Sequence, residues 1–167
     1  MNMRLYRKDD LAEIMTIADT AWASIFKMRR EALGDQISDF LNPAGDAKTK
    51  GLQVKAQIES GQYEIAVCEH ENHIVGFITY QIHGKSAQIN NNAAAKDTGL
   101  KGIGQTMYRW FLDRCREKQV RFISVYTGLD WAHAPARRAY ERAGFRRHLD
   151  HVTYYLDLEE AEDWEQK

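Results

Sequence analysis

The stretch KDTGLKGIGQTMYRWFLDRCREK, residues 96–118, decides how the rest of the chain is expected to fold. It begins with Gly99, Gly102 and Gly104 and continues with apolar residues at helical spacing. Glycine lets a ligand come close to the backbone, and the first turn of a helix presents unpaired N–H groups at its positive end. Lys101 adds a cation beside them. The stretch therefore predicts a loop and a helix start that bind a phosphate or a pyrophosphate.

Two common phosphate-binding motifs do not match this loop. A dinucleotide-binding fingerprint would have a third glycine three residues after Gly104, where the chain has Met107. A Walker loop has a glycine, four further residues and then Gly-Lys-Ser or Gly-Lys-Thr, and this string does not occur. An ordinary glycine-rich turn between a strand and a helix is the alternative that this stretch alone leaves open.

The chain has 167 residues, of which 44% are hydrophobic and 28% charged, and its net charge is −1. These values predict a single globular domain over residues 1–167 with a sizeable core. The balanced charge argues against a nucleic-acid partner. No signal-peptide pattern or long apolar run occurs, so we expect no membrane association and a cytoplasmic location. Cys68 and Cys115 lack metal-ligand spacing, so they are expected to be buried free thiols, and no metal site is expected.

Helices are expected over most of residues 8–60, after a short strand at residues 3–7. Apolar residues recur at helical spacing over residues 10–22 and 33–41, and more weakly over residues 47–60. Asp10 is the predicted cap of the first helix. The region is interpreted as the substrate-binding part of the domain. Aromatic and polar residues in and after the first helix are candidates for a substrate mouth, with core packing as the alternative: Trp22, Phe26, Met28, Arg29 and Arg30.

From residue 62 the apolar period changes to two, which is typical of strands. Three strands joined by short turns, and therefore antiparallel, are expected near residues 63–67, 74–83 and 87–93. A strand at residues 121–127 follows the helix after the glycine loop, so it should lie parallel to the third strand. A hairpin near residues 148–151 should then lead to a last strand at residues 152–158.

A second motif, APARRAYERAGF, occupies residues 134–145. Pro135 suits the first turn of a helix, and Gly144 suits the residue just after its end. Together with the glycine loop upstream, this motif resembles the GNAT superfamily of acetyl-CoA-dependent N-acetyltransferases, whose second signature is Asn-x-x-Ala-x-x-x-Tyr-Glu-x-x-Gly-Phe. The matching residues are Ala136, Tyr140, Glu141, Gly144 and Phe145, while His133 stands in the place of the Asn.

The glycine loop is similar to the cofactor loop of that superfamily, Arg/Gln-x-x-Gly-x-Gly/Ala. The match runs over residues 99–104, with Gly99 in place of the leading Arg or Gln. The resemblance covers about residues 62–158, which it identifies as a cofactor-binding core. It implies an α/β (α+β) fold with a mixed, mostly antiparallel central sheet, helices on both faces, and parallel strands that splay apart at the cofactor site.

The resemblance also implies an activity and the residues that support it. A member of this superfamily moves an acetyl group from its cosubstrate acetyl-CoA to an amine, here of a small molecule, by direct attack on the thioester. Tyr140 is the expected catalytic residue, as a hydroxyl donor to the leaving thiolate, although its ring also suits helix packing. The expected cofactor-binding residues are Ala93 and Ala94 in a bulged strand, Gly99, Leu100, Lys101, Gly102, Ile103, Gly104 and Gln105 around the pyrophosphate with Lys96 adding charge, and His133 and Tyr140.

The general base that deprotonates the amine is not assigned. Superfamily members often carry an acidic side chain on the strand before the loop, but this chain has Asn90, Asn91 and Asn92 there, and an amide cannot take up the proton. The remaining candidates are His83, Asp130, His133 and a water relayed through the Asn side chains.

Two other functions stay open at this point. A protein or peptide N-terminal acetyltransferase would use the same chemistry on a different acceptor. The missing leading Arg or Gln and the missing strand carboxylate also allow a non-catalytic domain that senses acyl-CoA. The terminal strands offer edges for pairing in a homodimer.

Overall fold

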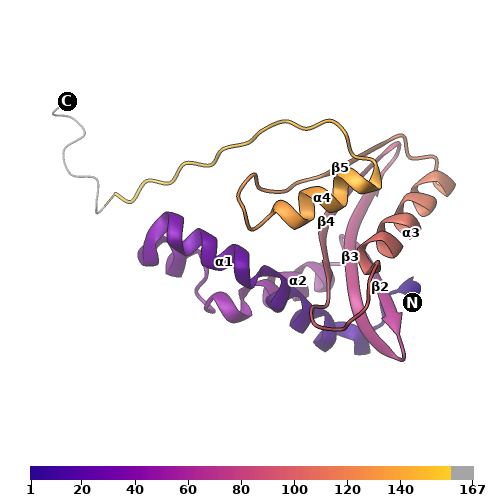
Figure 1. Cartoon of the computed structure of the whole chain (residues 1–167), viewed down its shortest axis with the longest axis horizontal. Helices are drawn as coiled ribbons and strands as arrows, with labels where there is room; N and C mark the ends of the chain where they lie inside the picture. Colours follow the sequence, from indigo (N-terminus) through magenta and orange to yellow (C-terminus); the bar gives the residue numbers. More distant parts are fainter. Residues whose placement is uncertain (159–167) are drawn as a thin grey trace.

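The computed structural model describes residues 1–158, which are built around a five-stranded sheet in the order β1-β2-β3-β4-β5 (Figure 1). The strands are β1 (Asn2–Leu5), β2 (Glu64–His70), β3 (His73–His83), β4 (Ser86–Ala94) and β5 (Phe122–Val125). Neighbouring strands are antiparallel except β4 and β5, which are parallel because a helix connects them. The mixed, mostly antiparallel sheet of the sequence prediction is therefore confirmed.

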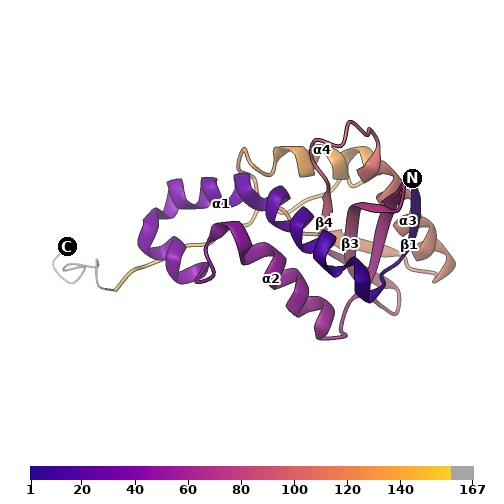
Figure 2. The same ribbon diagram turned by 90° about the horizontal axis from the view of Figure 1, so that it is seen from below.

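Helices cover both faces of this sheet. α1 (Leu11–Leu41) and α2 (Asp46–Glu59) lie side by side on one face, where Ile14 and Val54 pack against Phe77 of β3 (Figure 2). α3 (Ile103–Glu117) and α4 (Ala134–Ala143) lie on the other face, where Phe111 and Tyr80 share one core cluster. Burying apolar side chains on both faces of the middle strands is what makes the sheet the centre of the fold.

α3 packs unusually close to the sheet at Gly76 of β3. A Cβ atom at this position would lie 2.9 Å from both the Ile103 Cγ2 and the Met107 Sδ atoms of α3. Only glycine leaves room for that contact, so the glycine loop that precedes α3 is held against the end of the sheet.

β4 and β5 separate before β4 ends. The two strands pair only from Ser86 with Phe122 to Ile89 with Val125, while β4 continues to Ala94. The pairing of β4 with β3 steps over Asn90, which is therefore the extra residue of a β-bulge. This bulge lies earlier than the sequence analysis expected, since it was predicted near Ala93 and Ala94. The last part of β4 has one side that β5 does not cover.

The N-terminal helices differ from the prediction in their boundaries. Residues 23–32, expected as a connection, are helical, and α1 is interrupted only at Gly34, where φ is 78° and ψ is 173°. No proline or glycine occurs in residues 23–33, so helix propensity carries the first helix past its predicted end. Arg30 closes the kink, because its guanidinium donates to Asp35 at 2.8 Å, Asp39 at 2.7 Å and Asp46 at 2.9 Å.

The predicted hairpin and last strand at residues 148–158 are wrong. The segment runs past β5, with the His151 and Tyr126 rings 5.9 Å apart, and then leaves the sheet without the reversal that a hairpin requires (Figure 1). Alternation of apolar residues produces a strand only where a partner strand is in reach. Within the described residues the segment has no such partner, and Leu149, Val152, Tyr154, Leu156 and Leu158 remain exposed.

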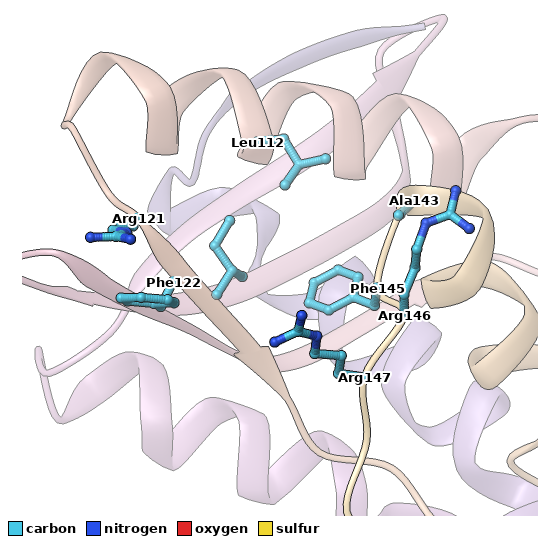
Figure 3. A pocket seen from close by; sticks show the side chains of 9 residues that line it. Leu112, Arg121, Phe122, Ala143, Phe145, Arg146 and Arg147 are labelled. Atoms are coloured by element: carbon cyan, nitrogen blue, oxygen red, sulfur yellow. The ribbon is translucent and has the colours of Figure 1, made fainter.

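An open groove lies along the edge of β5. It has a volume of about 370 Å³. Figure 3 shows apolar side chains from β5, α3 and the end of α4 in this groove, with arginines at its rim; the lining residues are Leu112, Arg121, Phe122, Ile123, Ala143, Gly144, Phe145, Arg146 and Arg147. The groove is at the Phe122 end of β5, away from the point where β4 and β5 separate.

A buried ion pair fixes the start of the chain. Asp10 was predicted to cap α1, but its carboxylate instead accepts two bonds from Arg4, at 2.7 and 2.8 Å, and one from the Arg7 backbone N–H at 2.7 Å. The same guanidinium also donates to Glu69 of β2. The hydrogen bond from Arg4 holds the pKa of Asp10 below its ordinary value, although burial opposes the shift.

Replacing Arg4 with Met should lower the free energy of unfolding by about 2–4 kcal/mol at pH 7, because Asp10 would keep its buried charge without its partner. A carboxyl whose pKa is depressed in the folded state stabilises the protein above its unfolded pKa of about 3.9, and this stabilisation is lost as the pH falls. The difference between Arg4→Met and wild type should therefore shrink toward pH 3, as measured by urea denaturation.

Lys27→Met provides the matched control. Lys27 and Glu31 form an exposed pair at 3.9 Å, so this substitution should change stability by less than about 0.5 kcal/mol. Equal effects of the two substitutions would contradict a special role for the Arg4 pair.

Candidate active site

The glycine loop ends in a helix start with unused hydrogen-bond donors. Gly102 is the N-cap of α3, and its φ of 82° and ψ of 8° lie in the left-handed region. Among residues 1–158 no side chain caps the helix, so within this part of the chain the N–H groups of Ile103, Gly104 and Gln105 keep no partner in its first turn. A Cβ atom at Gly102 or Gly104 would meet no atom closer than 3.8 Å. The helix start therefore offers both donors and space for a pyrophosphate.

Two residues near the loop are already bonded to the protein. The Leu100 N–H donates to the Thr98 Oγ1 atom at 3.2 Å, and the Lys96 ammonium donates to the Thr20 carbonyl of α1 at 2.9 Å. Lys96, which was expected to add charge near the phosphates, thus ties the loop to α1.

The opening between β4 and β5 beyond the Ile89–Val125 pair, termed the cleft, contains polar atoms without partners among the described residues. In the described part of the chain, the Asn90 Oδ1 and Thr127 Oγ1 atoms are buried and accept or donate no hydrogen bond. Both residues follow the last β4–β5 pair, Ile89 with Val125, so they lie on the two strands where these separate. Buried polar atoms are normally hydrogen-bonded, and the amide groups of a pantetheine arm would satisfy these two. The residues of the cleft therefore fit acetyl-CoA.

Backbone N–H groups of β4 point into the same cleft. The Ala95 N–H donates to the Val75 carbonyl at 2.8 Å, so it faces β3. Because the direction alternates along a strand, the N–H of Ala93 also faces β3, whereas those of Asn92 and Ala94 face the side that β5 leaves open. Of the two residues predicted near the carbonyl, Ala94 is the one placed to donate to an oxyanion, and Ala93 packs in the core.

Tyr140 lies on α4 next to this cleft, buried to 8% exposure. Its hydroxyl oxygen accepts a hydrogen bond from the Asn92 Nδ2 atom at 2.9 Å, and the Tyr108 hydroxyl donates to the Asn92 Oδ1 atom at 3.0 Å. Its ring stands edge-on to Tyr108 and Phe145 at centroid distances of 5.7 and 5.9 Å. Burial raises the pKa of Tyr140 to about 12, so its hydroxyl keeps its proton at neutral pH.

His133 is held by Asp130 in the turn before α4. The His133 N–H donates to the Asp130 Oδ1 atom at 3.0 Å, and the His133 Nδ1 atom lies 2.7 Å from Asp130 Oδ2. Burial opposes ionisation of Asp130, but the hydrogen bonds from His133 outweigh it and keep the pKa of this carboxyl below its usual value. Arg137 braces the turn by donating to the carbonyls of Gly128 and Asp130. His133 precedes Tyr140 by two helical turns, about 10 Å, so the two side chains are not neighbours.

His83, another candidate base, is not brought to the site. His83 is the last residue of β3 and pairs with Ser86, the first residue of β4. Ser86 precedes Asn92 by six residues, which is roughly 20 Å along β4.

The residues predicted for a substrate mouth divide into different roles. Phe26 is 2% exposed and belongs to the core, and Arg30 is occupied by three aspartates. Trp22 lies beneath the Lys50 ammonium, 4.5 Å from the ring centroid. Burial, with a smaller contribution from the Arg29 charge, lowers the pKa of Lys50 to about 8. Lys50 carried no sequence signal, because its pairing with Trp22 depends on the packing of α1 and α2.

Polar side chains join α2 to β4 on the face of the sheet that α1 and α2 cover. The Asn91 amide donates to Gln57 of α2 and to the Thr79 Oγ1 atom at 3.2 Å, and the Asn91 N–H donates to the same oxygen at 2.9 Å. Sequence reasoning missed this group and Tyr108. The strand-poor asparagine run was the signal that could have found Asn91 and Asn92.

Comparison with known proteins identifies the family to which the chain belongs. Residues 22–145 match the family model described as Acetyltransferase (GNAT) family. The chain therefore belongs to the GNAT family of acetyltransferases, and it is an acyltransferase of a family that uses acetyl-CoA.

Individual relatives differ in the acceptor that their names give. The chain is 26% identical over 139 residues to a Bacillus subtilis (strain 168) protein provisionally named ribosomal protein bS18-alanine N-acetyltransferase, covering 81% of this chain and 88% of that protein. The fold of this chain is similar to that of a mutant of the BH1408 protein of Bacillus halodurans, with a TM-score of 0.73 and 14% identity. The similarity covers 93% of this chain and 99% of that protein. The fold is also similar to an aminoglycoside acetyltransferase from a soil metagenomic sample in complex with sisomicin, with a TM-score of 0.59, 16% identity and coverage of 93% and 96%.

Neither a membrane-spanning helix nor a cluster of metal ligands is found among residues 1–158. None of the helices there is long and apolar enough to cross a membrane. No three His, Cys, Asp or Glu side chains of these residues gather closely enough to hold a metal ion.

The helix start can be tested with Gly104→Glu. An acid in the first turn favours the helix dipole, so the free protein should be at least as thermostable as wild type. The same charge would face the pyrophosphate, and the affinity for coenzyme A measured by calorimetry should fall by about tenfold or more.

Gly104→Ala is the control, since it also removes the glycine but adds no charge. It should bind coenzyme A more tightly than Gly104→Glu, and the gap should narrow at high salt. Wild-type affinity in the Glu variant would place the pyrophosphate elsewhere.

Proposed function

We propose that this protein acetylates a primary amine of a small molecule, with acetyl-CoA bound between the start of α3 and the cleft between β4 and β5. The observation that supports this most directly is the Tyr140 hydroxyl, held at 2.9 Å by Asn92 beside that cleft. The unpaired N–H groups at the start of α3 and the orphaned Asn90 and Thr127 oxygens support the same placement.

In the proposed reaction the amine nitrogen forms a bond to the thioester carbon, the C–S bond breaks, and its electron pair leaves on sulfur. The Ala94 N–H, on the open side of β4, is placed to donate to the carbonyl oxygen as negative charge develops there. The amine proton passes to water, because β4 (Ser86–Ala94) carries no carboxylate.

Tyr140 stabilises the leaving thiolate by donating a hydrogen bond. With a pKa of about 12 it is a much weaker acid than a thiol, whose pKa is about 8.5, so full transfer of its proton to the sulfur would be uphill. A donor that keeps its proton still lowers the energy of the anion.

The bridges around the acceptor side favour a small acceptor. Lys96 joins the loop to α1, and Asn91 joins β4 to α2, so both helices are held close to the end of β4. An extended peptide needs an open groove, whereas an enclosed site suits a small amine. The protein with bound sisomicin shows that a related fold accommodates such an acceptor.

N-terminal acetylation of a protein is the second candidate. The relative with 26% identity, whose name gives the alanine of a ribosomal protein as the acceptor, favours it. Thiol release should be measured with polyamines, aminoglycosides, amino acids and peptides that begin with alanine. Turnover restricted to small amines supports the first candidate, turnover restricted to peptides supports the second, and acetyl-CoA binding without any turnover would indicate a sensor.

Tyr140→Phe should lower kcat with the best acceptor by about 10²-fold and leave the dissociation constant of acetyl-CoA within about twofold of wild type. The ring is retained, so its packing on Tyr108 and Phe145 survives. Because the Tyr140 pKa is about 12, the hydroxyl is protonated throughout, and the loss should be the same at pH 7 and pH 10. A wild-type kcat would leave Tyr140 as a packing residue only.

A further inference from the structure

Asn92 is a polar residue in an otherwise apolar layer between the sheet and its helices. Its side chain lies between Tyr108 of α3 and Tyr140 of α4, which are 6% and 8% exposed. The surrounding core cluster includes Ile78, Ile89 and other apolar residues. Asparagine is unfavourable in strands and costly to bury unless its amide is hydrogen-bonded, so its presence here requires a specific reason.

The amide of Asn92 has a donor end and an acceptor end, and the two tyrosines use different ends. Tyr108 donates its proton to Oδ1 at 3.0 Å, and Nδ2 donates to the Tyr140 oxygen at 2.9 Å. A phenol has one proton and accepts through its lone pairs. Tyr140 therefore receives a hydrogen bond from Asn92 without spending its own proton on the amide.

The opposite orientation of the amide would reverse these roles. Oδ1 would then take the proton of Tyr140, and the proton of Tyr108 would need another acceptor. Burial raises the pKa of both phenols, and the neighbouring Tyr140 raises that of Tyr108 further, so both hydroxyls keep their protons at neutral pH. Tyr108 is only 6% exposed, and the observed orientation gives its proton the Asn92 Oδ1 atom as acceptor.

The alternation of β4 explains why three asparagines occur in succession. Asn91 points to α2, where Gln57 and Thr79 satisfy its amide, and Asn92 points to the opposite face. Asn90 occupies the bulge, with its oxygen at the cleft. Each asparagine therefore has its own surroundings, and only Asn92 contacts Tyr140.

We propose that Asn92 is a positioning residue for acetyl transfer: Tyr108 fixes the orientation of its amide, and the amide N–H holds the Tyr140 hydroxyl with its proton free for the departing sulfur. This inference rests on the role of Tyr140 under the proposed function. No proton is transferred along the chain of groups. The C–S electron pair leaves on sulfur, and Tyr140 donates a hydrogen bond to it.

The test is a double-mutant cycle with Asn92→Leu and Tyr140→Phe, measured as kcat for thiol release and as affinity for acetyl-CoA. Asn92→Leu should lower kcat by about tenfold, the value of one hydrogen bond, with little change in acetyl-CoA affinity. In the Tyr140→Phe background the same substitution should change kcat by less than about twofold, because the hydroxyl that it positions is gone. A merely structural role of Asn92 would not produce this dependence on the hydroxyl.

Two further variants keep the test decisive. Tyr108→Phe frees the amide to turn, so it should lower kcat by a few-fold and lose this effect when Tyr140 is Phe. It also replaces Asn92→Leu in the cycle if that variant does not fold. Tyr80→Phe is the control, since it removes another buried hydroxyl of the same core cluster, whose hydrogen-bond partner is Glu64 at 3.2 Å rather than Asn92. It should leave kcat unchanged.

The outcomes separate the inference from the proposed function. Wild-type kcat in Tyr140→Phe would refute the role of Tyr140 itself. A slow Tyr140→Phe with wild-type kcat in Asn92→Leu would overturn the inference alone. An equal loss from Asn92→Leu in both backgrounds would also overturn it, because Asn92 would then act independently of the hydroxyl.

Discussion

The separation of β4 from β5 after Ile89 is the constraint on which the site depends, since it leaves the last part of β4 without a partner strand on that side. Paired strands satisfy each other's backbone, so a ligand finds no donor between them. The bulge at Asn90 ends the regular register, and the N–H groups of Asn92 and Ala94 are left facing the open side. Gly76 of β3, the partner of Ala94, then lets α3 approach the sheet closely, so the start of α3 lies near the end of β4.

The polar residues of β4 connect this cleft to both layers of helices. Asn91 is bonded to Gln57 of α2, and Asn92 is bonded to Tyr108 of α3 and Tyr140 of α4. In a core of low polarity such bonds are strong when complete and destabilising when broken. These hydrogen bonds fix the orientation of side chains that apolar packing alone would hold less specifically.

Charged side chains add to the apolar packing that holds the N-terminal region on the sheet. Arg30 collects three aspartates across the kink at Gly34, and Arg4 joins β1 to Asp10 and Glu69. A guanidinium with several planar donors can bind more than one carboxylate at a time. These ion pairs hold the kink at Gly34 and the start of the chain in place, while helix propensity carries α1 past its predicted end.

The sequence by itself determined the elements whose signals are local: the alternating strands, the glycine-capped start of α3, and α4 between Pro135 and Gly144. It also identified Tyr140 and the glycine loop as the residues to examine. Only the tertiary structure decided which asparagine meets which helix, that the bulge is at Asn90, and that Asp10 binds Arg4. It also decided that residues 152–158 form no strand, because their pattern lacks a partner in space. Periodicity encodes which face of an element is apolar, whereas register, reach and hydrogen-bond direction arise only when distant segments are packed together.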